Sequence, residues 1–122
     1  MAVGSGRAAK DGTLRWTALL AILVLALEVS PARGQGQWTE LICSYDWDCD
    51  KAQRVMMCES KGEAQAFSSW NFGLYQINRV HQRRVAGGNL ELLFDPATNV
   101  RVAHEIWSEQ GWGPWVYCGR GA

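Results

Sequence analysis

The sequence has no excess of charge and none of the short motifs that identify several common classes of protein. Twelve Lys and Arg residues balance twelve Asp and Glu residues in the 122-residue chain. This balance argues against a nucleic-acid binder, which needs surplus basic residues to neutralise phosphates. There is no C-x-x-C pair, no H-E-x-x-H motif, no Gly-rich phosphate loop and no plausible Ser-His-Asp set. We therefore expect neither a metal ion nor an organic cofactor.

Long hydrophobic runs are also missing, apart from one uncharged stretch from Trp16 to Leu27. As a helix it would span about 18 Å, which is short of a hydrocarbon core of about 30 Å. Basic residues precede it, and Ser30-Pro31-Ala32 follows with small residues at the positions that a signal peptidase reads. The pattern predicts a signal peptide, residues 1–32, and hence a secreted, extracellular, cell-wall or periplasmic protein. The alternative is a tilted anchor that stays attached, the only membrane contact we expect.

Cysteine is scarce but even in number, and all four cysteines follow residue 32. In an oxidising compartment this predicts two disulfides, each stabilising a small core by about 2–4 kcal/mol. Spacing alone permits three pairings. We divide the mature chain into an N-terminal lead-in, residues 33–49, and one main domain, residues 50–119.

The hydrophobic spacing predicts a mainly α domain of the α+β kind, with a short β-hairpin insert. We expect Asp50 to cap a helix over 51–59, and Asp95 with Pro96 to start a helix over 96–110. Extended segments are predicted within 66–77. Asn78 and Asn89 are expected to cap two shorter helical turns, over about 79–86 and 90–94.

Glu59 occupies an unusual position in the first predicted helix. It continues the apolar face formed by Ala52, Val55 and Met56, at the last turn. Burial and the negative end of the helix dipole would both raise its pKa. Such a carboxylic acid stays protonated near neutral pH and can give its proton to a leaving oxygen. The alternative is a frayed last turn with Glu59 in water.

The two histidines are weaker candidates for chemistry. His104 lies beside Val100 and Trp107 on the predicted helix 96–110, which favours packing or the surface over catalysis. His81 follows Val80 and could border a cleft, although we favour a structural role for it as well.

Two motifs around Glu59 carry a resemblance to a known family. Cys58-Glu59-Ser60, followed by the N-F-G-L-Y-Q-I-N stretch of residues 71–78, resembles the paired signature of the lysozyme superfamily. Soluble lytic transglycosylases, goose-type lysozymes and c-type lysozymes share versions of it. The L-F-D-P-A-T-N stretch, residues 93–99, is similar to a helix start in the transglycosylase group. The resemblance covers about residues 50–119, most of the mature chain.

Both ends of the main domain resemble resuscitation-promoting factors. These proteins carry C-E-S at the catalytic glutamate and close with an E-Q-G…W…C-G tail, matched here by residues 109–111 and 115–119. In those relatives the cysteine beside the glutamate pairs with the terminal one. The resemblance thus implies disulfides Cys58–Cys118 and Cys43–Cys49. The tail would then lie next to Glu59, where its tryptophans could line the site or pack in the core.

The family likeness implies a secreted, monomeric enzyme that cleaves the β-1,4 bond between N-acetylmuramic acid and N-acetylglucosamine in peptidoglycan. Glu59 would protonate the glycosidic oxygen. Trp70 and Tyr75 are possible sugar-stacking surfaces, and Gly73 would allow close backbone approach or a positive φ angle. For Gln76 and Asn78, turn scaffolding is an equal alternative. The basic residues of 79–84 could meet peptide-stem carboxylates or simply face solvent. The substrate-binding set implied is Ser60, Asn71, Gly73, Tyr75, Gln76, Asn78 and Trp112.

One departure from the family pattern bears on the mechanism. In c-type lysozymes an Asp precedes the aromatic-Gly pair, and here Asn71 holds that position. An amide cannot be the second carboxylate of a two-carboxylate glycosidase. Among the other acidic residues, only Glu63 remains a candidate for the second carboxylate. A single acid favours a lytic transglycosylase, assisted by the N-acetyl group of the substrate. The alternatives are a hydrolytic lysozyme and a non-catalytic wall-binding or signalling module of the same fold.

Overall fold

The computed structural model describes residues 36–121. The predicted signal peptide, residues 1–32, lies outside this range. Within 36–121, no helix is both long enough and apolar enough to cross a membrane. The predicted class is confirmed, since the domain is mainly helical with a small antiparallel sheet and two disulfides.

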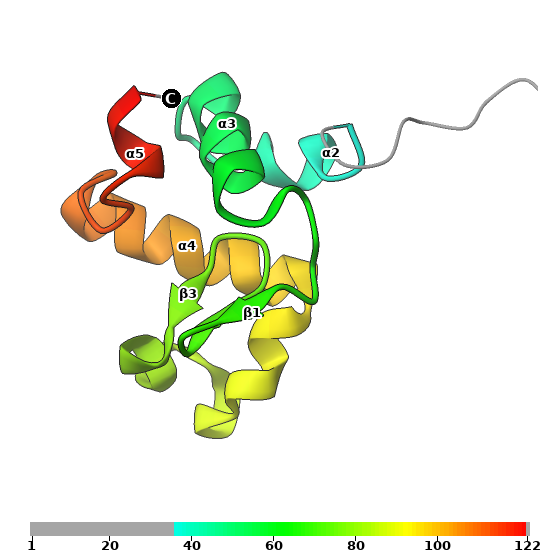
Figure 1. Ribbon diagram of the computed structural model, residues 1–122, viewed down its shortest axis with the longest axis vertical. Helices are drawn as coiled ribbons and strands as arrows, with labels where there is room; N and C mark the ends of the chain where they lie inside the picture. Colours follow the sequence, from blue (N-terminus) through cyan, green and yellow to red (C-terminus); the bar gives the residue numbers. More distant parts are fainter. Residues whose placement is uncertain (1–35, 122) are drawn as a thin grey trace, which may run out of the picture. The chain divides into compact units, whose positions relative to one another are not determined.

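The described residues contain four α-helices: α2 (Thr39–Ile42), α3 (Cys49–Ser60), α4 (Pro96–Gln110) and α5 (Cys118–Gly121). Helix α4 contacts α2 as well as β3 and η3, whereas α3 contacts α2 and α5. Figure 1 accordingly shows α4 crossing the domain between the other helices and the sheet. Helix α4 therefore connects the helical part of the domain to the sheet.

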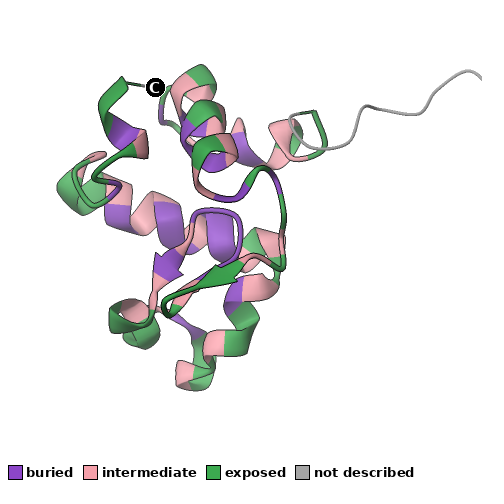
Figure 2. Ribbon diagram, viewed as in Figure 1, coloured by how far each residue is buried: buried purple, intermediate pink, exposed green. Residues whose placement is uncertain are grey.

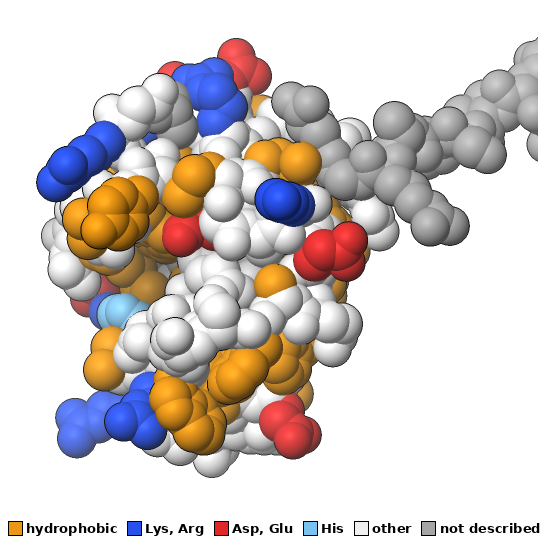
Figure 3. Space-filling view, viewed as in Figure 1, with side chains coloured by type: hydrophobic (Ala, Val, Ile, Leu, Met, Phe, Trp, Pro, Cys, Tyr) orange, Lys and Arg blue, Asp and Glu red, His pale blue; other side chains and the backbone are white. Residues whose placement is uncertain are grey.

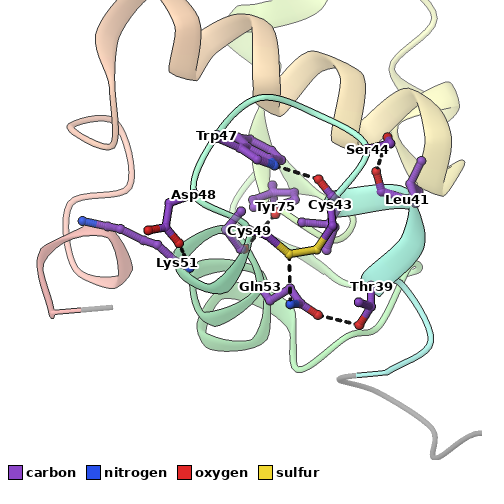
Figure 4. The surroundings of a disulfide bond; sticks show 12 residues. Thr39, Leu41, Cys43, Ser44, Trp47, Asp48, Cys49, Lys51, Gln53 and Tyr75 are labelled. Carbon is purple, nitrogen blue, oxygen red and sulfur yellow. Dashed lines mark hydrogen bonds between the residues drawn. A yellow bond between two sulfur atoms is a disulfide. The ribbon is translucent and has the colours of Figure 1, made fainter.

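Local capping signals set the helix boundaries, and one of our predictions was wrong. Helix α4 starts and ends as predicted, with the Asp95 carboxylate accepting a hydrogen bond from the Thr98 amide at 3.0 Å. Helix α3 begins at Cys49, and Asp48 rather than Asp50 is its N-cap. The Asp48 carboxylate accepts from the Lys51 amide at 2.9 Å (Figure 4). Asp50 instead lies in the first turn, where the helix dipole also favours a carboxylate.

The predicted hairpin is confirmed and extended by one strand. Strands β1 (Phe67–Ser68), β2 (Asn71–Phe72) and β3 (Ile77–Asn78) form an antiparallel sheet in that order. The register pairs Ser68 with Asn71 and Asn71 with Asn78, so three polar residues lie side by side across the sheet.

Three short 3-10 helices connect the sheet to α4. They are η1 (Arg79–Arg84), η2 (Ala86–Gly88) and η3 (Leu90–Phe94). Asn78 caps η1 and Asn89 caps η3, as predicted, through side-chain oxygens that accept from the amides of Val80 and Glu91. The first of these helices places residues 79–84 directly after the last strand.

The core is formed by buried side chains of α3, α4 and the segment from β2 to β3, and Figure 2 shows buried ribbon in each of them. Ile42 and Trp47 also belong to it, being 0% and 5% exposed. The Trp47 indole N–H donates to the Ile42 carbonyl at 2.8 Å. The core therefore includes residues of the segment 33–49 that the sequence analysis treated as a lead-in.

A buried amide on α4 ties the sheet to the helices. Asn99 is fully buried, and its Oδ1 accepts from the Tyr75 amide at 2.8 Å. Its Nδ2 donates to the carbonyls of Phe72 and Leu93, each at 2.8 Å. Gly73 lies against this amide with φ of +71°. Three hydrogen bonds from one buried side chain fix the loop after β2.

We predict that Gly73→Ala destabilises the domain by at least about 3 kcal/mol. A Cβ atom at this position would collide with both Asn99 Nδ2 and the Leu93 carbonyl oxygen, in addition to adopting a left-handed backbone. Gly87→Ala is the matched control, because Gly87 has φ of +61° but no atom within 4 Å of a Cβ. It should lose only about 1 kcal/mol in urea unfolding. Equal losses in the two variants would refute the packing argument.

Candidate active site

One cleft lies between the end of α3, the sheet, η1 and the C-terminal segment. Its volume is about 350 Å³, and the face drawn in Figure 3 is hollowed between the part with α3 and α5 and the part with the sheet. Its lining is mixed, with amide, hydroxyl, imidazole, aliphatic and aromatic side chains around a single carboxyl group. The lining residues are Glu59, Ser68, Asn71, Gln76, Ile77, Asn78, His81, Ile106, Pro114, Trp115, Val116 and Tyr117.

Glu59 reaches this cleft from the last turn of α3 and is half-buried. Its Oε2 atom is shielded from solvent and has no hydrogen-bond partner among residues 36–121. Burial raises the pKa of the Glu59 carboxyl above the ordinary glutamate value. The ionised form would leave a negative oxygen buried without a donor, so the neutral acid is favoured. The neutral Glu59 carboxyl group can therefore donate a proton to a ligand in the cleft.

The two asparagines of the sheet differ in whether their side chains are free to bind a ligand. Asn78 Nδ2 donates to Asn71 Oδ1 at 3.0 Å, and Asn78 Oδ1 accepts from the Val80 amide at 3.0 Å. The amide of Asn78 is therefore committed to the protein. Asn71 lines the cleft, and its Nδ2 group has no hydrogen-bond partner among the described residues. Asn71 can thus donate hydrogen bonds to a ligand.

Gln76 lines the cleft but holds the sheet together. Its Nε2 donates to the carbonyls of Ala66 and Gly73 at 3.1 and 3.0 Å, and its Oε1 accepts from the Ser68 hydroxyl at 2.7 Å. Its backbone has a positive φ of 48°. All its polar atoms serve the turn, so the scaffolding alternative describes Gln76 best.

Four predicted substrate-binding residues do not line the cleft: Ser60, Gly73, Tyr75 and Trp112. Ser60 is buried and bonds the Met56 carbonyl, while the fully buried Tyr75 hydroxyl donates to the Ala52 carbonyl at 2.7 Å. Trp112 stacks on Trp47 with ring centroids 5.5 Å apart, and Gly73 faces Asn99. These contacts describe support of the site, and contact of the four residues with substrate stays a prediction.

The C-terminal segment forms one wall of the cleft. The structure contains the disulfides Cys58–Cys118 and Cys43–Cys49, which is the pairing that the resemblance implied. Trp115 is 6% exposed, and its indole N–H donates to the Tyr75 carbonyl at 2.9 Å. Pro114, Val116 and Tyr117 complete the wall. The sequence left Trp115 open between lining the site and packing in the core. Its three neighbours were not predicted, although the tether of Cys118 beside Glu59 was the signal for them.

Comparison with protein families identifies the family of this chain. The model of the family described as "Lysozyme like domain" matches residues 46–116, which is more than half of the chain. The chain belongs to the lysozyme-like domain family. At the level of the family it is a peptidoglycan-cleaving domain. No curated protein and no solved structure matches it.

The matched part of this lysozyme-like domain contains Glu59, the sheet and most of the C-terminal wall. Glu63, the acid that the sequence analysis kept open, is exposed and does not line the cleft. His104 packs against Tyr45 and Trp47, and its Nε2 lies 2.6 Å from Asp46 Oδ1, which agrees with a packing role. Neither residue is placed to react with a ligand in the cleft.

The basic residues of η1 have separate environments in the lysozyme-like domain. The Arg79 guanidinium lies over the Trp70 ring, 5.3 Å from its centroid. Arg84 forms ion pairs with Glu105 and Glu109 of α4. The expectation that 79–84 is one solvated face therefore holds only in part, because Arg84 joins two elements.

Proposed function

We propose that this chain is a secreted lytic transglycosylase, which cleaves the β-1,4 bond between N-acetylmuramic acid and N-acetylglucosamine. One observation supports the proposal above all others. Glu59 is the single carboxyl group among the residues that line the cleft, and its shielded Oε2 atom has no partner within 36–121. A neutral acid in a groove is the group needed to protonate a glycosidic oxygen.

In the proposed reaction, Glu59 gives its proton to the bridging oxygen as the bond from that oxygen to C1 breaks. This C1 belongs to N-acetylmuramic acid. The carbonyl oxygen of the N-acetyl group on that sugar then bonds to C1 and stabilises its positive charge. In the second step the C6 hydroxyl oxygen attacks C1 and displaces the acetamide oxygen. Its proton passes to the Glu59 carboxylate, which restores the acid. No water is consumed, and the product ends in a 1,6-anhydro sugar.

The surroundings of Glu59 support a route with one carboxylate. Two-carboxylate glycosidases place a second acid across the scissile bond. Asn71, in the position of that acid in c-type lysozymes, is an amide that lines the cleft. Its Nδ2 group can donate to the acetamide or hold a water. Glu63 lies outside the cleft, so substrate assistance is the chemistry that these side chains favour.

We expect mass spectrometry of digested peptidoglycan to show muropeptides lighter by one water than hydrolysis products. Digestion in water enriched in heavy oxygen should add no label to the new ends, because the C6 hydroxyl and not water attacks C1. Glu59→Gln, checked for folding by circular dichroism, is the control for contaminating enzymes. Labelled reducing ends would instead assign a hydrolytic muramidase, and wall binding without cleavage would assign a binding module.

A further inference from the structure

His81 is a second titratable side chain in the cleft that the proposed reaction does not use. It lies on η1, directly after the sheet, and lines the same cavity as Glu59 and Asn71. Its ring is half-buried. The sequence analysis favoured a structural role for it, but the structure gives its ring an ordered polar environment on one side and the cleft on the other.

A network of charged groups fixes the tautomer of His81. Arg84 Nε donates to His81 Nδ1 at 3.3 Å. Arg84 is in turn held by Glu109 through an ion pair and by Glu105, with 3.8 Å between Nη1 and Oε2. A guanidinium group only donates hydrogen bonds, so Nδ1 must be the acceptor. The hydrogen of the neutral imidazole is then on Nε2.

The same network keeps the imidazole neutral. Burial lowers the pKa of His81, and the positive charge of Arg84 lowers it further, whereas Glu109 acts in the opposite direction. Protonation would place a second N–H at Nδ1, directly facing the guanidinium, and would break the hydrogen bond between them. Among residues 36–121, Nε2 has no hydrogen-bond partner, so its N–H remains available in the cleft.

We propose that His81 is a substrate-binding residue, whose Nε2–H donates a hydrogen bond to a carbonyl or ether oxygen of the bound glycan. The proposal rests on the proposed function for the identity of the ligand. His81 Nε2 and Asn71 Nδ2 are then two of the neutral donors in the cleft that holds the acid. Neutral donors suit the uncharged hydroxyl, ether and amide oxygens of a saccharide, whereas a carboxylate group would favour a cationic partner.

The test compares glycan binding and cleavage by His81→Ala, His81→Gln and the matched control Arg83→Ala. Glutamine keeps an N–H donor, and Arg83 is an exposed residue of the same helix that does not line the cleft. Binding is measured by calorimetry with an oligosaccharide of alternating N-acetylglucosamine and N-acetylmuramic acid, in the Glu59→Gln background. We expect His81→Ala to weaken binding about three- to tenfold. His81→Gln should recover part of the loss, and Arg83→Ala should bind normally.

Long-range proton–nitrogen NMR spectra of the Glu59→Gln protein provide a readout that a structural role would not change. We expect Nε2 of His81 to carry the proton at neutral pH and its resonance to shift when the oligosaccharide is added. A charged ring, a proton on Nδ1, or an Nε2 resonance that the saccharide does not move would overturn the proposal.

The outcomes separate this inference from the proposed function. If the wild-type protein cleaves peptidoglycan and His81→Ala binds and cleaves equally well, the role of His81 is refuted and the function stands. If the wild-type protein does not cleave but binds the saccharide, the function fails and the affinity of His81→Ala alone decides the inference. If the wild-type protein does not cleave peptidoglycan and no variant binds the saccharide, both are refuted.

Discussion

Replacing Glu59 with glutamine is expected to reduce the rate of peptidoglycan cleavage by about 10²–10⁴-fold. Glutamine has nearly the shape of the neutral acid but cannot give a proton to the leaving oxygen. No other carboxyl group lines the cleft within the described part of the chain, so none is placed to take over. The loss should fall on kcat, because the amide still occupies the same space.

The folded state should tolerate this substitution, which makes the activity loss interpretable. Oε2 of Glu59 has no hydrogen-bond partner within residues 36–121, so no bond to that atom is lost. Circular dichroism and the free energy of unfolding should therefore match the wild type or exceed it. Glu63→Gln is the matched control, since it removes an exposed carboxyl group outside the cleft. A lytic Glu59→Gln protein, or an inactive Glu63→Gln protein, would contradict the assignment.

Removing the disulfide Cys58–Cys118 is expected to destabilise the domain strongly. The two cysteines are 60 residues apart. Loop-closure entropy then predicts a loss of about 4 kcal/mol, a large part of the stability of so small a domain. The same bond anchors the segment Pro114–Tyr117 that forms one wall of the cleft. Cys58→Ala with Cys118→Ala should thus lose activity even where the protein remains folded.

The second disulfide supplies the control for this prediction. Cys43 and Cys49 are only 6 residues apart, and the same entropy argument predicts a loss of about 2 kcal/mol. They do not line the cleft, so the double alanine variant should keep its activity at low temperature. Urea unfolding and turbidity clearing of cell walls measure the two effects. Equal losses of activity in the two double variants would show that the C-terminal wall does not need its tether.

Sequence alone predicted the elements whose signals are local. Asp95 with Pro96 marks the start of α4, and Asn78 and Asn89 mark the 3-10 helices, because a capping side chain bonds amides two or three residues away. The start of α3 was predicted two residues too late, because two nearby aspartates offer the same local signal. Asp48 and Asp50 both fit an N-cap, and only the structure shows which amide the carboxylate meets.

Only the site residue that lies on a helix could be predicted from the spacing of apolar residues. Periodicity placed Glu59 on the inner face of α3, but no spacing rule tells which hairpin side chains face a cleft. Tyr75 was expected to contact sugar and instead donates to the Ala52 carbonyl in the core. Such contacts join residues far apart in sequence. The ion pairs that hold Arg84 behind His81 likewise bring η1 against α4.

The buried acid also has a consequence for stability. The pKa of Glu59 is raised in the folded protein, so the folded state binds the proton more tightly than the unfolded state does. The resulting stabilisation is fully present below the unfolded pKa and is lost as pH rises through the folded pKa. Proton donation by Glu59 should decline over the same rise, and Glu59→Gln should abolish its contribution to the pH dependence of stability.

Titration of the Glu59 carboxyl group by carbon NMR tests the central claim most directly. Protein labelled at glutamate side-chain carboxyl carbons is titrated, and the Glu59 resonance is identified by its absence in Glu59→Gln. We predict a pKa above the ordinary glutamate value and above that of the exposed Glu63. A Glu59 pKa at or below the ordinary value would mean an ionised, solvated side chain, and would contradict its role as the acid.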